Sequence, residues 1–317
     1  MDEFDLIRRY FDRSVLDDSV RIGVGDDGAV LVVDSDCELV TVIDTLVEGV
    51  HYPVDLQPDA IGYRSVAVNL SDVAAMGARP RWMTLALTLV DANETWLEGF
   101  AEGLYAAAQE HNVSLVGGDT TRGSQPVISI QITGDVDAGM SISRSGASPG
   151  DLVFVSGTIG DAAAGLVLIK AGDVSTPEQQ FLADRFCRPT ARVSLGRLLS
   201  GVASAAIDIS DGLFSDAHKL LSSSGVGGRI EADCLPLSAA LRNTCSDDEA
   251  LQFALTGGDD YELCFTVRPD DEQTVMMLSE QCRVPVARIG EVKEGTALLC
   301  TRAGNTIEID HGGYRHF

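Results

Sequence analysis

Six short segments rich in aspartate and glycine recur along the chain, and each adjoins an apolar stretch. They are residues 23–29, 41–45, 69–72, 116–121, 206–212 and 256–261. One segment of this kind would be explained by a turn or a helix cap, because aspartate and glycine favour both. Six of them, each beside an apolar segment, indicate a binding site built at the ends of strands, where ligands usually bind in α/β sheets.

The pattern around these segments predicts strands interleaved with helices, in an α/β (α+β) fold. The clearest helix is residues 94–110, because Trp96, Phe100 and Leu104 share one face. Other helices are predicted at residues 60–76, 161–170, 177–186, 191–199 and 211–222, and strands at residues 39–43, 83–90, 113–116, 127–133, 152–155, 205–209, 251–255, 261–267 and 297–301. A glycine-rich stretch at 134–150 predicts a boundary between an N-terminal metal- and nucleotide-binding α/β domain, 1–137, and a C-terminal α/β domain, 138–317.

The carboxylates favour magnesium and phosphate chemistry. Mg²⁺ is a hard cation that takes oxygen ligands and often shares them with substrate phosphates. Glycine beside a carboxylate lets the backbone approach such a ligand closely. The chain has only three lysines, Lys170, Lys219 and Lys293, and none lies in its first half. Phosphate charge bound there would therefore be offset by metal ions and arginines.

Several other phosphate-binding and hydrolytic classes are excluded by their missing motifs. The chain has no Gly-x-x-x-x-Gly-Lys-Ser/Thr loop and no His-Arg-Asp with Asp-Phe-Gly, so it is neither a P-loop enzyme nor a protein kinase. Residues 157–161 depart from the dinucleotide pattern Gly-x-Gly-x-x-Gly. No Gly-x-Ser-x-Gly elbow is present. No residue is predicted to be a covalent nucleophile.

The charge balance bears on partners and location. There are 48 acidic and 23 basic residues, for a net charge of −25. Such a surface repels nucleic acid and anionic membranes, so neither is expected as a partner. The seven cysteines are scattered without a Cys-x-x-Cys pair, the start is acidic, and no apolar run approaches a membrane span. These features predict a cytoplasmic protein with reduced thiols.

Seven motifs follow one another over nearly the whole chain. They are Gly25-Asp26-Asp27, residues 44–51 (DTLVEGVH), residues 67–78 (AVNLSDVAAMGA), Gly117-Gly118-Asp119-Thr120-Thr121, residues 144–147 (RSGA), residues 207–213 (IDISDGL) and residues 257–263 (GGDDYEL). In this order, the motifs together resemble the thiamine-monophosphate kinase family. This family shares a superfamily with aminoimidazole ribonucleotide synthetase and selenophosphate synthetase.

The resemblance implies a two-domain aminoimidazole ribonucleotide synthetase-like fold and a homodimer whose N-terminal sheets pair into a barrel. It also implies ATP as co-substrate, several Mg²⁺ ions, and direct in-line transfer of the γ-phosphoryl group to thiamine monophosphate, giving thiamine diphosphate. The expected metal ligands are Asp27, Val42, Ile43, Asp44, Asp72, Asp119, Asp208 and Asp211. The expected nucleotide contacts are Gly118, Asp119, Arg144 and Ser210, and the expected substrate contacts are His51, Asp259 and Tyr314.

Two departures from the family pattern affect these expectations. Many members have Ser or Thr just before the Asp44 position, whereas Val42 and Ile43 offer only backbone carbonyls. Many members also have Glu where this chain has Asp259, which is one methylene shorter. An aminoimidazole ribonucleotide synthetase-like ligase is the alternative within the superfamily. A non-catalytic protein that binds Mg²⁺ or nucleotide is the alternative from another class, and ATP turnover distinguishes it.

Overall fold

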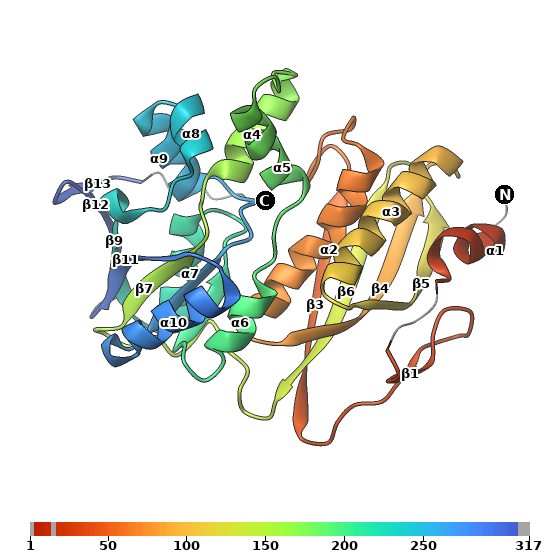
Figure 1. The fold of residues 1–317 in the computed structure, drawn as a ribbon, viewed down its shortest axis with the longest axis horizontal. Coiled ribbons are helices and arrows are strands. Elements are labelled where there is room, and N and C mark those ends of the chain that lie inside the picture. The colour runs from red at the N-terminus through yellow and green to blue at the C-terminus, as the bar shows by residue number, and fades with distance from the viewer. Residues whose placement is uncertain (1–2, 14–16, 310–317) are drawn as a thin grey trace. The chain divides into compact units, whose positions relative to one another are not determined.

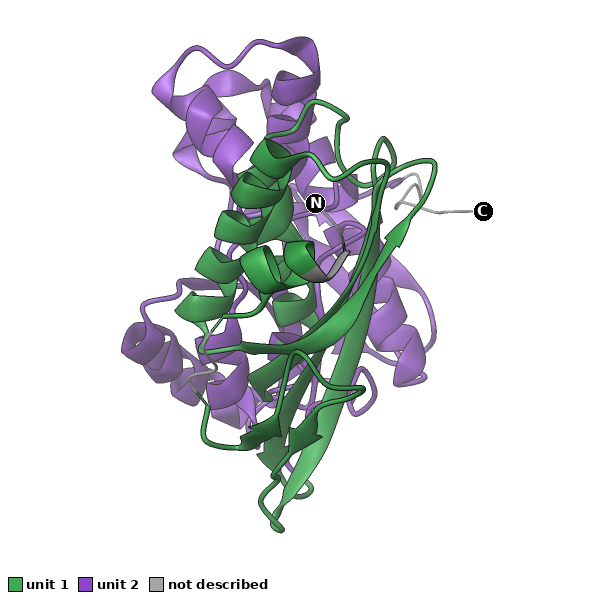
Figure 2. Cartoon of the chain, turned by 90° about the vertical axis from the view of Figure 1, so that its right-hand side faces the viewer, with its two compact units in different colours: residues 1–73, 78–139 green, residues 74–77, 140–317 purple. Residues whose placement is uncertain are grey.

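The computed structural model describes residues 3–13 and 17–309, which form two compact units (Figure 2). Unit 1 comprises residues 1–73 and 78–139, and unit 2 comprises residues 74–77 and 140–317. The chain passes from unit 1 to unit 2 for the last time between residues 139 and 140, two residues after the predicted boundary between 137 and 138. Residues 74–77, which the prediction placed in the N-terminal domain, group with unit 2. Tyr314 lies outside the described residues.

Unit 1 contains a four-stranded sheet in the order β3-β6-β4-β5 (Figure 1). Its strands are β3 (Cys37–Val47), β4 (Arg79–Leu89), β5 (Ser114–Arg122) and β6 (Val127–Asp137). Strands β4 and β5 run parallel, and the other two pairs run antiparallel. Unit 1 also contains α1 (Glu3–Leu6), the π-helical turn η1 (Ile7–Phe11) and the ribbon β1 (Val20–Ile22) with β2 (Val30–Leu31).

Two long helices, α2 (Pro58–Ala75) and α3 (Glu94–Glu110), lie along one face of this sheet (Figure 1). Asn93 caps α3 by accepting a hydrogen bond from the Trp96 backbone. A Cβ atom on Gly103 would lie 1.8 Å from the Asp59 carbonyl oxygen of α2. Glycine at this position is therefore required by the close approach of the two helices.

The opposite face of the sheet carries mostly polar side chains, with the exposed Leu39 and Ile43 of β3 among them, and we call it the polar face. Its polar members are Thr41, Thr45, Thr84, Thr88, Thr121, Ser129, Gln131 and Thr133. They bond across the strands: Thr45 lies 2.7 Å from Ser129, and Thr88 lies 3.0 Å from Thr121, oxygen to oxygen. Residues of alternate parity, such as Ile130 and Leu85, are buried on the helix side. One face of the sheet thus forms the core of unit 1.

Unit 2 contains a seven-stranded sheet in the order β13-β12-β9-β11-β7-β10-β8. Its strands are β7 (Leu152–Ser156), β8 (Ala205–Asp208), β9 (Gly227–Glu231), β10 (Leu263–Val267), β11 (Val286–Lys293), β12 (Leu298–Arg302) and β13 (Asn305–Ile307). Its helices are α4 (Asp161–Ala171), α5 (Pro177–Cys187), α6 (Val193–Leu199), α7 (Leu213–Ser223), α8 (Ala239–Thr244), α9 (Asp247–Thr256) and α10 (Glu272–Cys282), with 3-10 turns η2 (Ala232–Cys234) and η3 (Pro269–Asp271).

The structure corrects some of the sequence predictions. Residues 251–255, predicted as a strand, lie within helix α9, because a capping box between Ser246 and Glu249 starts a helix just upstream. Asp44 and Asp119 were predicted at strand ends but lie inside β3 and β5, whereas Asp72 lies inside α2, in agreement with the helix predicted at residues 60–76. Strands β9 and β11 and helices α8 and α10 were not predicted. Among the described residues, no helix is both long and apolar enough to cross a membrane.

Candidate functional site

In unit 1, helix α2 places a polar side chain against strand β3. The Asn69 side-chain oxygen accepts a hydrogen bond from the Asp44 backbone N–H at 2.9 Å, and its amide donates to the Ser65 carbonyl oxygen at 3.0 Å. Asn69 is fully buried, so both bonds satisfy groups that water cannot reach. Asp72 follows Asn69 by three residues and therefore lies on the same side of α2. Strand β3, which carries Asp44, and helix α2, which carries Asp72, thus lie against each other.

The backbone of β3 differs between the two residues before Asp44. Because the Asp44 N–H is bonded to Asn69, it points away from the paired strand β6. In an antiparallel pair, alternate residues direct both backbone groups to the same side. The Val42 carbonyl therefore points outward with Asp44, whereas the Ile43 carbonyl is directed into the ladder with β6. Of these two predicted backbone ligands, only Val42 has a carbonyl directed outward from the sheet.

Asp119 lies far from Asp44 within one chain. Strands β6 and β4 separate β3 from β5, which corresponds to roughly 14 Å along the sheet. Asp44 pairs in register with the buried Ile130, whereas Asp119 pairs with the exposed Ala86, so the two carboxylates point to opposite faces. Gly118 precedes Asp119, and a Cβ atom there would lie 2.0 Å from the Leu85 carbonyl oxygen. Strand packing alone thus requires this glycine.

His51 lies in the turn that follows β3. Its Nδ1 accepts a hydrogen bond from the Val47 backbone N–H at 2.9 Å. A neutral histidine with Nδ1 accepting carries its proton on Nε2. His51 is therefore set to act as a hydrogen-bond donor through Nε2. The next residue, Tyr52, is 2% exposed, and burial raises the pKa of its hydroxyl well above the ordinary value.

The segment that leads to Asp27 is anchored to the sheet at its start. Arg81 of β4 bonds both carboxylate oxygens of Asp17, at 3.0 and 3.1 Å, and also bonds Asp135 at 2.6 Å. Trp82 donates to the Ser19 hydroxyl at 3.0 Å. Burial raises the pKa of Asp17, but the bonds from Arg81 and Ser19 outweigh it and lower that pKa to about 2. Asp27 itself lies in the exposed turn beyond β1.

In unit 2, Asp208 ends strand β8, and the loop after it carries Ser210 and Asp211. The buried Asp216 of α7 accepts the backbone N–H groups of both, at 3.0 and 2.9 Å. Lys219, one turn further along α7, bonds Asp216 at 2.7 Å and Asp211 at 2.5 Å. Lys219 thus pairs with one carboxylate of this loop and one of α7, and the α7 carboxylate fixes the backbone of the loop.

A second loop, residues 258–262, lies against the first. The Asp259 N–H donates to the Ser210 carbonyl oxygen at 2.9 Å, and the Tyr261 N–H donates to that of Ile209 at 2.9 Å. A Cβ atom on Gly258 would lie 2.2 Å from the Ser210 carbonyl oxygen. The predicted nucleotide-contact loop and the predicted substrate-contact loop therefore form one connected surface within unit 2.

Arg144 belongs to a turn that is also fixed within unit 2. Ser224 at the end of α7 donates to the Arg144 carbonyl oxygen at 3.3 Å and accepts from the N–H groups of Gly146 and Ala147. The Ser143 carbonyl oxygen accepts from Ala206 of β8 at 3.0 Å. The backbone beneath Arg144 is thus held on two sides, while its side chain is exposed.

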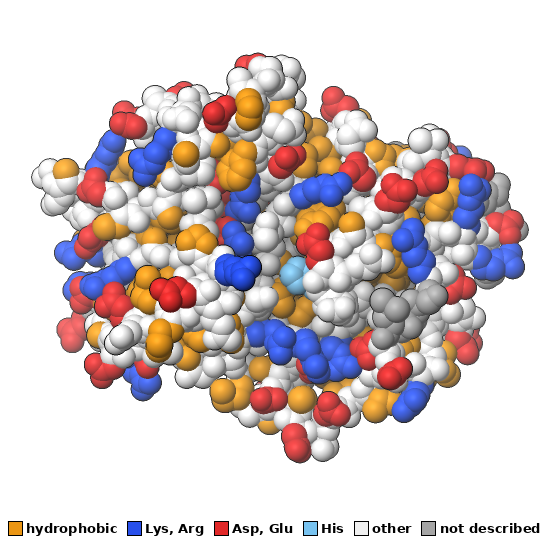
Figure 3. All heavy atoms as spheres, in the orientation of Figure 1, with side chains coloured by type: hydrophobic (Ala, Val, Ile, Leu, Met, Phe, Trp, Pro, Cys, Tyr) orange, Lys and Arg blue, Asp and Glu red, His pale blue; other side chains and the backbone are white. Residues whose placement is uncertain are grey.

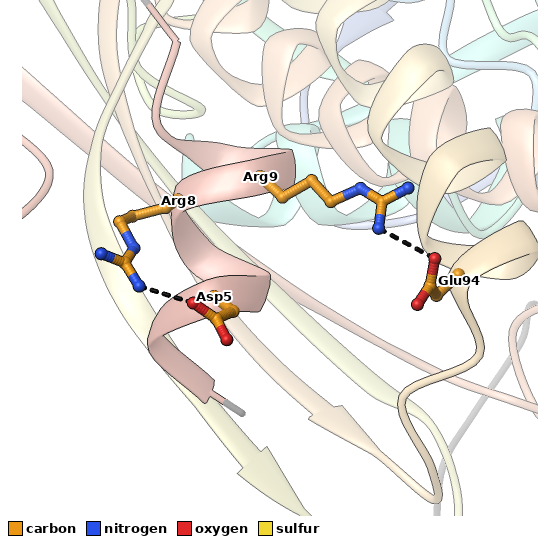
Figure 4. A pocket seen from close by; sticks show the side chains of 4 residues that line it. All are labelled: Asp5, Arg8, Arg9 and Glu94. Carbon is orange, nitrogen blue, oxygen red and sulfur yellow. Dashed lines mark hydrogen bonds and ion pairs between the residues drawn. The ribbon is translucent and has the colours of Figure 1, made fainter. Parts of the chain in front are cut away.

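A pocket between α1, η1 and the start of α3 is lined by Asp5, Arg8, Arg9 and Glu94 (Figure 4). Arg8 pairs with Asp5 at 2.5 Å and Arg9 pairs with Glu94 at 2.8 Å. None of these four residues belongs to the predicted site. On the face shown in Figure 3, acidic side chains are spread among arginines and lysines.

Comparison with known proteins identifies the family of the chain. Residues 25–136 match the model of the AIR synthase related protein N-terminal domain, and residues 148–299 match that of its C-terminal domain. The thiamine-monophosphate kinase of Haemophilus influenzae is 44% identical over 100% of this chain and 98% of its own length. The chain belongs to the thiamine-monophosphate kinase family.

Two solved structures of this family share the fold over almost the whole chain. The thiamine-monophosphate kinase of Stenotrophomonas maltophilia K279a superposes with a TM-score of 0.89 at 42% identity, covering 97% of this chain and 98% of its own. The AaThiL complex with AMPPCP and TMP superposes with a TM-score of 0.81 at 32% identity, covering 99% of this chain and 96% of its own. The two-domain mixed α/β architecture is therefore that of the kinase family.

The structure groups the predicted site residues only in part. It brings Ser210, Asp211 and Asp259 together in unit 2 and sets Asp44 beside α2 in unit 1. Across residues 3–13 and 17–309, it forms no preassembled group of three or more His, Cys, Asp or Glu side chains suited to a metal ion.

Four residues that support the site were not predicted from the sequence: Asn69, Asp216, Lys219 and Tyr261. A signal existed for Lys219, because it is one of three lysines and closely follows the acidic motif of residues 207–213.

Proposed function

We propose that this chain transfers the γ-phosphoryl group of ATP to the phosphate of thiamine monophosphate and forms thiamine diphosphate. The observation that carries the proposal is the full-length likeness to the AaThiL complex with AMPPCP, an ATP analogue, and TMP. The joined loops of unit 2 support it, because they hold a predicted nucleotide contact, Ser210, beside a predicted substrate contact, Asp259.

We assign the metal sites to Mg²⁺ on the chemistry of the donor set. The side-chain donors are Asp27, Asp44, Asp72, Asp119, Asp208 and Asp211, and the backbone donor is the Val42 carbonyl, because the Ile43 carbonyl is directed into the ladder with β6. All are hard oxygen donors, which Mg²⁺ prefers. Since the described side chains form no preassembled cluster, the ions would take further oxygen ligands from the bound phosphates. Bound Mg²⁺ supplies positive charge that offsets the phosphate oxygens.

The protein's own contribution is orientation. Arg144 and Ser210, with the backbone at Gly118, are assigned to the nucleotide, and Asp216 holds the Ser210 loop in place for it. His51 is assigned to thiamine monophosphate as a donor through Nε2. We infer direct in-line transfer, since both reactants are held by the protein and no covalent nucleophile is assigned.

The homodimer is proposed from the sheet of unit 1. Its polar face is not covered by α2 or α3, and a barrel closed by a second copy would enclose it. Asp44 and Asp119 lie on the two edge strands, β3 and β5, and barrel closure could bring each near the partner's opposite edge. Light scattering should give twice the chain mass of 33.6 kDa. A mass of one chain at micromolar concentration contradicts the dimer.

The activity is tested by incubating the chain with ATP, MgCl₂ and thiamine monophosphate and measuring thiamine diphosphate by chromatography. Free thiamine is the matched control, and we expect no phosphorylation of it, because its acceptor is a neutral hydroxyl that would need a positioned base. Chelation of Mg²⁺ should abolish turnover and weaken ATP binding. Equal turnover of thiamine and thiamine monophosphate would contradict the proposal.

A further inference from the structure

The segment 258–262 adopts an unusual backbone. Asp259 has φ +69° and Tyr261 has φ +53°. Both values lie in the left-handed region, which is disfavoured for residues with a side chain. Two such residues in one short loop persist only where surrounding contacts hold them there.

Two residues of this segment, Asp260 and Glu262, make those contacts. Asp260 is fully buried and accepts from the backbone N–H groups of Gly160 at 2.7 Å and Ala162 at 3.4 Å, at the start of α4. Glu262 is also fully buried and accepts from Ser156 at 2.6 Å, from Arg185 at 2.8 Å, and from Arg192. Both carboxylates therefore fix the loop to buried groups of unit 2.

The odd-numbered residues contact one another instead. The Tyr261 hydroxyl donates to the Asp259 carboxylate at 3.1 Å, and Tyr261 is only 8% exposed. A buried aromatic ring has a restricted rotamer, so its hydroxyl is a fixed point for the carboxylate. Both residues have left-handed backbone, and their side chains meet in this hydrogen bond.

We infer that Tyr261 is a positioning residue that orients the Asp259 carboxylate toward the thiamine part of the substrate; this rests on the proposed function. A carboxylate repels the phosphate end of thiamine monophosphate. The other end carries a cationic thiazolium ring and an amino group, which a carboxylate attracts or accepts from. Asp259 therefore recognises the cationic, amine-bearing end, and Tyr261 acts on substrate affinity through it.

The test is Tyr261→Phe, which removes one hydroxyl and keeps the ring. We expect KM for thiamine monophosphate to rise about 5-fold to 10-fold, as for loss of one ordinary hydrogen bond that acts on the substrate through its partner. KM for ATP, kcat and the melting temperature should stay within about twofold and two degrees of wild type. The matched control is Tyr63→Phe, which removes a hydroxyl bonded to Glu110 at 2.9 Å in unit 1 and should leave every kinetic constant unchanged.

A double-mutant cycle decides whether Tyr261 acts through Asp259. If it does, adding Tyr261→Phe to Asp259→Asn weakens thiamine monophosphate binding, measured by calorimetry, no further than Asp259→Asn alone. Additive effects, or an unchanged dissociation constant for Tyr261→Phe, overturn the inference. If the wild-type chain binds thiamine monophosphate but forms no thiamine diphosphate, the proposed function is overturned. The double-mutant cycle, measured by binding alone, still tests the role of Tyr261 in that case. Wild-type chain that does not bind thiamine monophosphate overturns both.

Discussion

Replacing Glu262 by Gln tests the buried network beneath the loop of residues 258–262. Glu262 is fully buried, and its two oxygens accept from Ser156, Arg185 and Arg192. Glutamine has nearly the same shape but no charge, and its amide would face an arginine. Two guanidinium groups would then remain in the interior without the carboxylate that neutralises them.

The magnitude follows from that loss of charge. Removing one partner of a buried ion pair costs about 3–5 kcal/mol, because the remaining charge stays desolvated. For a unit of this size, about 2–4 °C of melting temperature corresponds to each kcal/mol, so we expect a fall of about 6–20 °C. The matched control is Glu272→Gln, which breaks a 3.7 Å pair with Arg288 at the surface and should change stability by no more than about 1 kcal/mol.

Calorimetry is the appropriate assay, because both tryptophans, Trp82 and Trp96, lie in unit 1. Tryptophan fluorescence therefore reports the unfolding of unit 1. If the calorimetric transition shifts and the fluorescence transition does not, the loss of stability lies in unit 2. A Glu262→Gln chain that melts within two degrees of wild type would refute the reasoning, since the arginines would then have found other compensation.

Three further predictions concern single sites. Asp17→Asn should reduce the free energy of unfolding at neutral pH. Because the pKa of Asp17 is lowered to about 2 in the folded chain, the stability advantage of wild type over this variant, measured by urea unfolding, should shrink as pH falls from about 4 to about 2. A stability advantage that does not change with pH contradicts this prediction. Asp72→Asn should reduce thiamine diphosphate formation by on the order of 10²-fold or more while the melting temperature stays unchanged, and turnover near wild type would exclude Asp72 as a ligand. Gly258→Ala should destabilise the chain and abolish turnover, because its Cβ would meet the Ser210 carbonyl oxygen at 2.2 Å; a fully active, equally stable variant counts against the joined loops.

Elements with strong local signals could be predicted from the sequence. Helix α3 has the predicted bounds, Glu94–Glu110, because its cap at Asn93 and its apolar stripe are both encoded within the segment. Residues 251–255 were assigned wrongly as a strand because five residues of mostly apolar character fit either structure. The deciding signal, the capping box at Ser246 and Glu249, lies outside that short run.

The candidate site was harder to predict, because strand length and side-chain partners depend on distant segments. Asp119 lies inside β5 because pairing with β4 continues through Arg122, well past the apolar residues that identify the strand. The contact between Tyr261 and Asp259 depends on two left-handed residues, which no propensity indicates. Family resemblance supplied the predicted roles of Asp44 and Asp208, because their residue types and spacing alone do not identify metal ligands.

The four residues 74–77 affect how this chain can be recombined with its relatives. They group with unit 2, where a Cβ on Gly196 would lie 2.0 Å from the Ala74 carbonyl oxygen and where the Met76 carbonyl oxygen accepts from Ile142 at 3.0 Å. A chimera joined at residue 140 would import a foreign 74–77 segment against a native Gly196. Exchange of halves between family members therefore requires residues 74–77 to be transplanted with the C-terminal half, and a fragment that starts at 140 lacks part of its own packing.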